Sequence, residues 1–211
     1  MAGAGARRPR DLLRAIGVNV LGAVVVVLFA RANLEFYRQT HRLIGVLFII
    51  QELCLAVAFL VRRPARSVTG RSLDWVAAVG GTFGGFLLRP SGLHLALAGK
   101  AGVTLQVIGL ATWMLSFARL GRSFGLVAAD RGLVTSGPYR LVRHPLYLAY
   151  VVTQFGYLLQ SISIRNGLVL AFTWACQMVR ATAEERHLLA TVPTYSDYLK
   201  RVRWRLIPGV W

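Results

Sequence analysis

The sequence predicts an all-α, polytopic integral membrane bundle of about six transmembrane helices, with five spans plus a re-entrant hairpin as the alternative. Hydrophobic residues make up 55% of the 211-residue chain and charged residues only 16%, whereas a soluble domain is about 25% charged. The formal net charge is +17. The basic residues lie between apolar stretches, where membrane topology and anionic headgroups select for them, and this argues against nucleic-acid binding.

Six apolar stretches approach the roughly 20 residues that a helix needs to cross a bilayer. In order, they cover about 14–32, 43–61, 73–88, 101–120, 146–159 and 167–179. The basic segment before the first stretch is similar to a signal peptide, but no small-residue cleavage site follows 20–30, so we expect an uncleaved helix. The last two stretches are short, which predicts a tight helical hairpin that extends beyond the bilayer.

The basic residues also predict the orientation of these spans. Of the 25, 19 lie before the first stretch, in the second-to-third and fourth-to-fifth connections and in the C-terminal part, and 6 lie elsewhere. Because positive charge marks the cytoplasmic side, we expect both termini and the 135–147 loop in the cytoplasm. We expect one membrane domain over 1–211, with substrate-side helices in 1–120 and a cofactor-binding catalytic half in 121–211.

Polar and small residues inside the apolar stretches carry further expectations. Four glycines of the third stretch predict a close-packing helix surface: Gly80, Gly81, Gly84 and Gly85. An acid at mid-membrane is costly, so Glu52 indicates either a substrate-binding role or a polar interhelical contact with Gln51, Gln106 or Gln154. No histidine or cysteine has metal-ligand spacing. We expect buried Cys54 and Cys176, interfacial His41 and His94, and His187 on a helix surface.

The segment from Thr135 to Tyr147 is polar and turn-rich and stands between two apolar stretches. Gly137-Pro138 predicts a turn, and Pro145 suits the first turn of a helix because its missing N–H is not needed there. Further along, Arg180 and Glu184 have i, i+4 spacing and share a helix face. An exposed ion pair is the alternative interpretation of that spacing.

Taken together, these motifs resemble the isoprenylcysteine carboxyl methyltransferase family, within a wider group of integral-membrane methyltransferases that includes phospholipid N-methyltransferases. The resemblance covers about 121–208. It rests on the order and spacing of GRSF, RGLVTSGPYRLVRHPLYLAY, RATAEE and YSDYLKRV. Two departures, Ala149 and Pro193 in place of glycines, affect helix and tail packing and no expected ligand.

The resemblance implies S-adenosylmethionine as the cofactor. It implies that the cofactor lies along Arg131, Gly132, Leu133, Val134, Tyr139, His144, Pro145, Leu146 and Tyr147, and that Glu184 also binds it. Arg180 would face the methyl acceptor, so Arg180 and Glu184 are the expected catalytic residues, with no metal.

The chemistry of these residues agrees with that cofactor. A carboxylate suits the free N–H groups of a helix that begins near Pro145, and Glu184 suits an ammonium or ribose hydroxyls. Tyr139 and Tyr147 can stack on adenine, and Arg180 can bind an anionic acceptor. The C-terminal residues from Pro193 onward predict an interfacial segment that folds over the pocket.

The sequence therefore predicts a methyltransferase for a lipophilic or prenylated acceptor in contact with membrane lipids. A carboxyl O-methyltransferase of isoprenylcysteine type is favoured, and a phospholipid N-methyltransferase or thiol S-methyltransferase is the alternative. A small transporter with Glu52 in its path is the alternative of another class, but the inverted repeats typical of one are not found. A non-catalytic relative that only binds lipid is disfavoured by the intact Arg180, Glu184, His144 and Tyr147.

Overall fold

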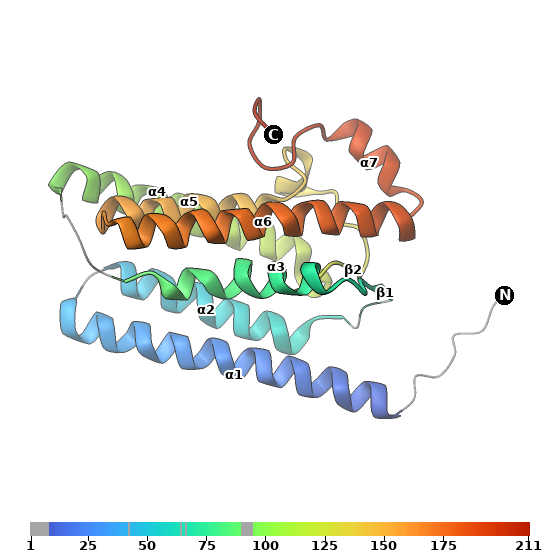
Figure 1. Cartoon of the computed structure of the whole chain (residues 1–211), viewed down its shortest axis with the longest axis horizontal. Coiled ribbons are helices and arrows are strands. Elements are labelled where there is room, and N and C mark those ends of the chain that lie inside the picture. Colours follow the sequence, from blue (N-terminus) through green and yellow to red (C-terminus); the bar gives the residue numbers. More distant parts are fainter. Residues whose placement is uncertain (1–8, 42, 64, 66, 90–94) are drawn as a thin grey trace. The chain divides into compact units, whose positions relative to one another are not determined.

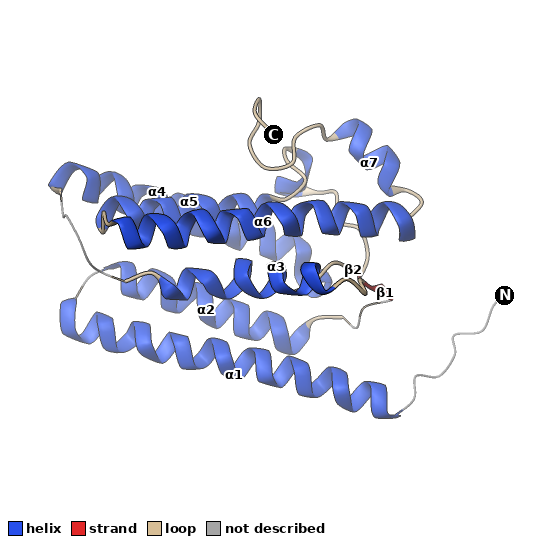
Figure 2. Cartoon of the chain, viewed as in Figure 1, coloured by secondary structure: helices blue, strands red, loops and turns tan. Residues whose placement is uncertain are grey.

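The structure, a computed structural model, describes residues 9–41, 43–63, 65, 67–89 and 95–211. These residues are mostly helical, as predicted, and Figure 2 shows the helices together with one small sheet. The chain divides into two compact units, Met1–Pro64 and Ala65–Trp211. The predicted functional halves, 1–120 and 121–211, stay predictions.

The first unit is a pair of helices, α1 (Pro9–Thr40) and α2 (Leu43–Val61). The bounds of α2 agree with the predicted stretch, whereas α1 runs eight residues past the predicted 14–32, because good helix formers such as Leu34, Glu35 and Gln39 continue it. It ends before His41, whose φ is +51°. Gly22 packs against the Phe59 ring.

Glu52 is buried between these two helices, with 3% of its surface exposed. Its Oε1 accepts a 2.8 Å hydrogen bond from Asn33 Nδ2. The contact is interhelical, as one interpretation expects, and its partner among the described residues of the first unit is Asn33. A substrate-binding role for Glu52 stays a prediction.

The second unit contains α3 (Ser72–Phe83), η1 (Gly84–Leu87), α4 (Ala96–Leu120), α5 (Pro145–Gln160) and α6 (Ile164–Thr191). In Figure 1, α4, α5 and α6 run alongside one another, and α3 lies along α6. The expected single helix over 73–88 agrees with the structure as far as Phe83 and is wrong only in its last five residues, where the chain continues as a 3₁₀ turn from Gly84 to Leu87. Apart from proline, glycine is the residue with the lowest helix propensity, which explains why the α-helix ends at this point. A Cβ at Gly84 would also lie only 2.7 Å from the Thr173 side chain.

The glycines of α3 and η1 confirm the predicted close-packing surface. A methyl group at Gly80 would lie 2.7 Å from Cys176 Sγ, and one at Gly81 would lie 3.1 Å from Arg180 Cδ. Only a residue without Cβ lets these backbones and side chains approach so closely. The result is that α3 lies directly against the part of α6 that carries Arg180.

Short elements connect the helices and surround one end of this unit. They are β1 (Ser67–Val68), η2 (Gly121–Ser123), β2 (Ala129–Asp130), η3 (Gly137–Arg140) and α7 (Tyr195–Arg201). β1 and β2 are antiparallel, with Ser67 opposite Asp130. His187, expected on a helix surface, is half-buried and its Nε2 lies 2.9 Å from Ser67 Oγ. His94 lies outside the described residues.

The hairpin of α5 and α6 has arms of unequal length. Ser163 caps α6 by accepting a hydrogen bond from the Asn166 N–H. The 28 residues of α6 span about 42 Å at 1.5 Å per residue, which exceeds a hydrocarbon core of about 30 Å. The predicted stretch 167–179 therefore continues without a break into the segment that carries Arg180 and Glu184.

Two helical segments of the described chain are long and apolar enough to cross a membrane by length and composition, Asn19–Thr40 and Ala96–Ser123. The apolar part of α2 is shorter, and α5 has 16 residues. Six spans, or five with a re-entrant hairpin, stay predictions.

Candidate active site

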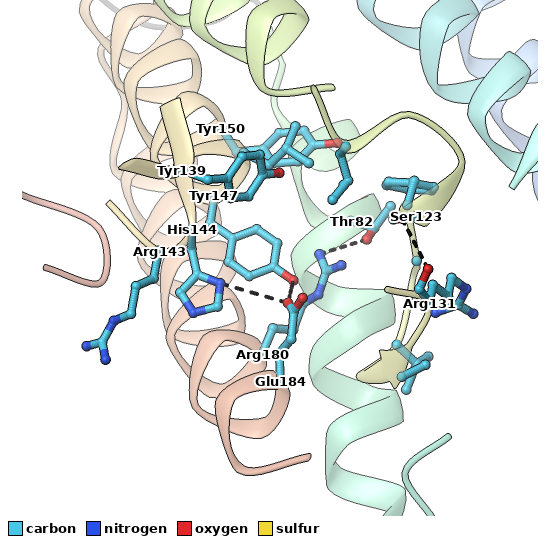
Figure 3. A pocket seen from close by; sticks show the side chains of 16 residues that line it. Thr82, Ser123, Arg131, Tyr139, Arg143, His144, Tyr147, Tyr150, Arg180 and Glu184 are labelled. Carbon is cyan, nitrogen blue, oxygen red and sulfur yellow. Dashed lines mark hydrogen bonds and ion pairs between the residues drawn. The ribbon is translucent and has the colours of Figure 1, made fainter. Parts of the chain in front are cut away.

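A pocket opens at the end of the second unit where the loop after α4 meets α3, α5 and α6 (Figure 3). Its empty volume, including the open mouth, is about 640 Å³. Seven of the predicted site residues line it: Arg131, Tyr139, His144, Leu146, Tyr147, Arg180 and Glu184. Residues 49 positions apart in the chain, Arg131 and Arg180, thus reach one cavity.

Glu184 is the acid that faces this pocket. Its Oε2 accepts a 2.8 Å hydrogen bond from Tyr147 Oη and lies 3.8 Å from His144 Nδ1. The His144 and Tyr147 rings are stacked, with centroids 5.3 Å apart. About a third of the Glu184 side chain, 34%, remains exposed, so the carboxylate can still accept bonds from a ligand.

Arg180 is buried, with 6% of its surface exposed, and its described partners are uncharged. Nη1 donates to Thr82 Oγ1 at 3.0 Å and to Gln177 Oε1 at 3.2 Å, and Nη2 donates to the Leu126 carbonyl at 2.9 Å. The guanidinium also lies over the Tyr147 ring, 4.8 Å from its centroid. These contacts fix a positive charge in the pocket wall, and within the described residues no carboxylate forms an ion pair with it.

Glu185 is turned away from Glu184 and is surrounded by cationic groups. Its Oε1 lies 3.1 Å from both His144 Nε2 and Arg143 Nε, and its Oε2 accepts a 2.9 Å bond from Arg205 Nε. The Arg143 contact is an ion pair without hydrogen-bond alignment. An ionised carboxylate can only accept, so the His144 Nε2 carries a hydrogen in this contact.

The loop between α4 and α5 is held by its own polar contacts. Asp130 Oδ1 accepts from the Gly132 N–H, and Ser123 Oγ donates to the Arg131 carbonyl. Gly132 has a φ of +101°, a conformation in which a residue with a Cβ would be strained.

Four of the expected cofactor ligands do not line this pocket. They are Gly132, Leu133, Val134 and Pro145. Leu133 packs instead against the apolar cluster of Leu188, Tyr195, Tyr198 and Val202. Their role toward a cofactor stays a prediction.

The N-terminus of α5 offers fewer free N–H groups than expected. Pro145 has none, and the N–H groups of Tyr147 and Leu148 donate to the His144 carbonyl. In the described part of the chain, the Leu146 N–H has no such acceptor. This helix end can therefore offer one first-turn N–H group to an anion.

Tyr139 connects the pocket to the C-terminal residues. Its carbonyl accepts a 2.7 Å bond from Tyr198 Oη. Burial raises the pKa of Tyr139 well above its ordinary value, and the nearby Glu184 charge adds to this. The phenol therefore stays neutral and can act as a donor, not as a base.

Several pocket residues were not among the predicted site residues. They are Thr82, Leu120, Ser123, Phe124, Gly125, Val127, Ala129, Arg143 and Tyr150. Ser123 and Phe124 belong to the GRSF motif, and Tyr150 ends the motif that begins at Arg131. The motifs therefore include these residues, but no function was predicted for them. Thr82 lies in an apolar helix and carries no sequence signal, because its role depends on α3 packing against α6.

A known protein family resembles the part of the chain that carries most of this pocket. Residues 97–192 match the family described as phospholipid methyltransferase, which confirms the resemblance to this group of methyltransferases over that segment. The match points to methyltransferase activity, and together with the two apolar helical segments it indicates a membrane-associated protein.

Two curated relatives are similar to half of the chain. A cobalt-zinc-cadmium resistance protein of Cupriavidus metallidurans is 33% identical over 109 residues, which is 51% of this chain and 46% of that protein. A nickel-cobalt-cadmium resistance protein of Alcaligenes xylosoxydans xylosoxydans is 32% identical over 108 residues, 51% of this chain and 47% of that protein. The aligned part is thus about half the length of either relative. Among the described residues, no group of three or more His, Cys, Asp and Glu could hold a metal ion.

Proposed function

We propose that the protein is an S-adenosylmethionine-dependent methyltransferase that methylates a lipophilic acceptor carrying an anionic group. The observation that carries the proposal is the pocket in which an accessible carboxylate, Glu184, and a buried guanidinium, Arg180, both contact Tyr147. One stretch of α6 thus offers both a negative group and a fixed positive group to the pocket, and the Tyr147 ring contacts both.

The residues present fit S-adenosylmethionine. Glu184 can accept hydrogen bonds from its ammonium or ribose hydroxyls, and the Tyr139 and Tyr147 rings can contact adenine and tolerate the sulfonium. When bound, the cofactor supplies an electrophilic methyl group. The task of the protein is then to align acceptor and methyl group, so no metal or covalent intermediate is invoked.

Arg180 is assigned to the acceptor. A buried cation without an anionic partner is costly, and an acceptor carboxylate or phosphate would supply that partner through a charge-assisted bond. Thr82, Gln177 and the Leu126 carbonyl already hold the guanidinium in place before an acceptor binds. Binding of the acceptor therefore costs little side-chain conformational entropy at Arg180.

The acceptor is proposed to be a prenylcysteine-type carboxylate. The phosphate of an aminophospholipid would satisfy Arg180 equally, and the matched family is described by phospholipids. A lipophilic thiol is the third acceptor class to be tested. We further propose that the chain crosses the membrane several times with the pocket and both termini in the cytoplasm, as the distribution of basic residues predicts.

Cofactor binding is the first test. Calorimetry with S-adenosylhomocysteine on the purified protein should give a micromolar Kd, which Glu184→Ala and His144→Ala weaken about tenfold or more because a charge-assisted bond is lost. Asp197→Asn, at an exposed acid, is the matched control and should bind normally. Absence of binding in folded samples would refute the enzyme assignment.

Turnover is the second part of this test. Labelled S-adenosylmethionine is supplied with prenylcysteine, aminophospholipid and lipophilic thiol acceptors. Arg180→Ala should keep the Kd for S-adenosylhomocysteine and lose methyl transfer. If it abolished cofactor binding with the fold intact, the assignment of Arg180 to the acceptor would be wrong.

A further inference from the structure

Residues 195–211 form a segment here called the C-terminal strap. It is tied to the loop between α4 and α5, here called the site loop (121–144). Its end is a hook in which the N–H groups of Arg205, Leu206 and Ile207 donate to the Trp211 carbonyl. Two further main-chain bonds join it to the loop before α5. The Arg143 N–H donates to the Trp204 carbonyl and the His144 N–H to the Arg205 carbonyl, both at 2.9 Å.

The strap and the adjoining loop expose cations together with apolar side chains. The exposed cations are Arg140, Lys200, Arg201 and Arg203. The exposed apolar residues are Leu141 at 71%, Ile207 at 43% and Val210 at 75%. The one acid of the strap, Asp197, lies 3.3 Å from Lys200, which leaves the other cations in excess.

The aromatic residues of the strap lie beside arginines. The Arg203 and Arg205 guanidinium groups are each 5.1 Å from the ring centroid of a tryptophan, Trp204 and Trp211 respectively. Tryptophan, arginine and lysine beside exposed aliphatic residues are typical of segments that lie in the headgroup region of a bilayer.

We propose that the C-terminal strap binds the headgroups of anionic lipids, and that this contact holds the site loop in its binding conformation. The exposed cations match anionic headgroups, and the aliphatic side chains need an apolar phase, which an acidic polymer in solution would not offer. α6 is longer than a hydrocarbon core is thick, so the strap that follows it can lie at a membrane surface.

Two side-chain bonds carry the effect into the pocket. Arg205 of the strap donates to Glu185 Oε2, and Glu185 Oε1 is bonded to His144, which lines the pocket. A strap held at the surface therefore fixes the position of His144. This coupling rests on the proposed function, whereas the lipid contact does not.

The test uses the full chain in nanodiscs of phosphatidylcholine, alone or mixed with phosphatidylglycerol. One readout is an environment-sensitive fluorophore at Val210→Cys, in a Cys54→Ala, Cys176→Ala background. The other is the Kd for S-adenosylhomocysteine. Phosphatidylglycerol should shift the fluorophore emission to the blue and lower the Kd roughly threefold or more, and high salt should reverse both.

Matched variants separate strap charge from total charge. The strap variant removes the exposed cations of the strap and of the adjoining loop: Arg140→Gln, Lys200→Gln, Arg201→Gln, Arg203→Gln. The control variant removes four other exposed cations, Arg31→Gln, Arg38→Gln, Lys100→Gln, Arg165→Gln. The strap variant should lose both lipid effects and the control should keep both.

Each contrary result has its own meaning. Equal lipid responses of the two variants, or no response of the wild type, would overturn the proposal. A fluorophore shift with an unchanged Kd would overturn the coupling alone. If S-adenosylhomocysteine bound in no lipid, the proposed function would fail, and the fluorophore would still decide the lipid contact.

Discussion

Glu184 and Glu185 are consecutive in the chain, yet their side chains have different surroundings. Neighbouring residues of an α-helix point about 100° apart, so Glu184 faces the pocket with 34% of its side chain exposed, whereas Glu185 is 5% exposed. The i, i+4 spacing predicts that Arg180 and Glu184 share a face, with an exposed ion pair as the alternative. Arg180 is buried instead and bonded to uncharged oxygens.

We expect Glu185→Gln to lower the free energy of unfolding by about 3 kcal/mol, because it leaves Arg143 and Arg205 without their buried anion. Thermal unfolding midpoints in detergent measure the change. Asp197→Asn is the control, since an exposed pair contributes at most about 1 kcal/mol. An unchanged midpoint for Glu185→Gln would contradict this role.

The same residue gives a pH dependence. Burial alone would raise the pKa of Glu185, but the His144 hydrogen bond and the charges of His144, Arg143 and Arg205 outweigh it and lower that pKa. Its stabilisation is therefore complete above the unfolded-state pKa of about 4.3 and is lost as pH falls through the lower folded-state value. As pH is lowered through the folded-state pKa of Glu185, the thermal unfolding midpoint should fall further for the wild type than for Glu185→Gln. Parallel pH curves for the two proteins would contradict the stabilisation by ionised Glu185.

At the scale of elements, glycine positions decide how closely the helices approach. A methyl group at Gly102 of α4 would collide with the Gly156 carbonyl of α5, and Gly156 in turn lies against Gly102 and Gln106. The sequence marks the glycines of α3 as a cluster, but the single glycines of α4 and α5 can be paired only once the two helices are placed side by side.

Gly102→Ala should destabilise the protein by about 1–3 kcal/mol, because the added methyl group forces α4 and α5 apart. Gly99→Ala in the same helix is the matched control, since a Cβ there meets nothing within 4 Å among the described residues. The control should be neutral or stabilising by up to about 1 kcal/mol, as alanine favours helices over glycine. Thermal midpoints compare the two, and equal effects would contradict the close approach.

For the whole molecule, the number of membrane crossings can be measured at the two ends of α5. Arg140 precedes α5 and Arg165 lies at the start of α6, and both are exposed. If α5 and α6 each cross, single cysteines at these positions in a background without Cys54 and Cys176 should react with an impermeant reagent from opposite faces of vesicles. Labelling of both from one face would favour the re-entrant hairpin.

Sequence alone determined the helical class and the extent of α2, because apolar length is a local property of the chain. The resemblance to a known family implied that Tyr139, His144, Tyr147, Arg180 and Glu184 belong to one site, and all five line the pocket. The division of the chain at Pro64 and the end of the α3 helix at Gly84 needed the structure.

Tertiary structure alone decided which groups meet across long stretches of chain. Thr82 holds Arg180 from 98 residues away, and Arg205 brings the C-terminal strap to Glu185. No periodicity records such pairs, because they arise from the packing of α3 on α6 and from the path of the chain after α7. The tertiary structure also gives the two adjacent glutamates different partners. Glu184 faces the pocket, whereas Glu185 contacts His144, Arg143 and Arg205.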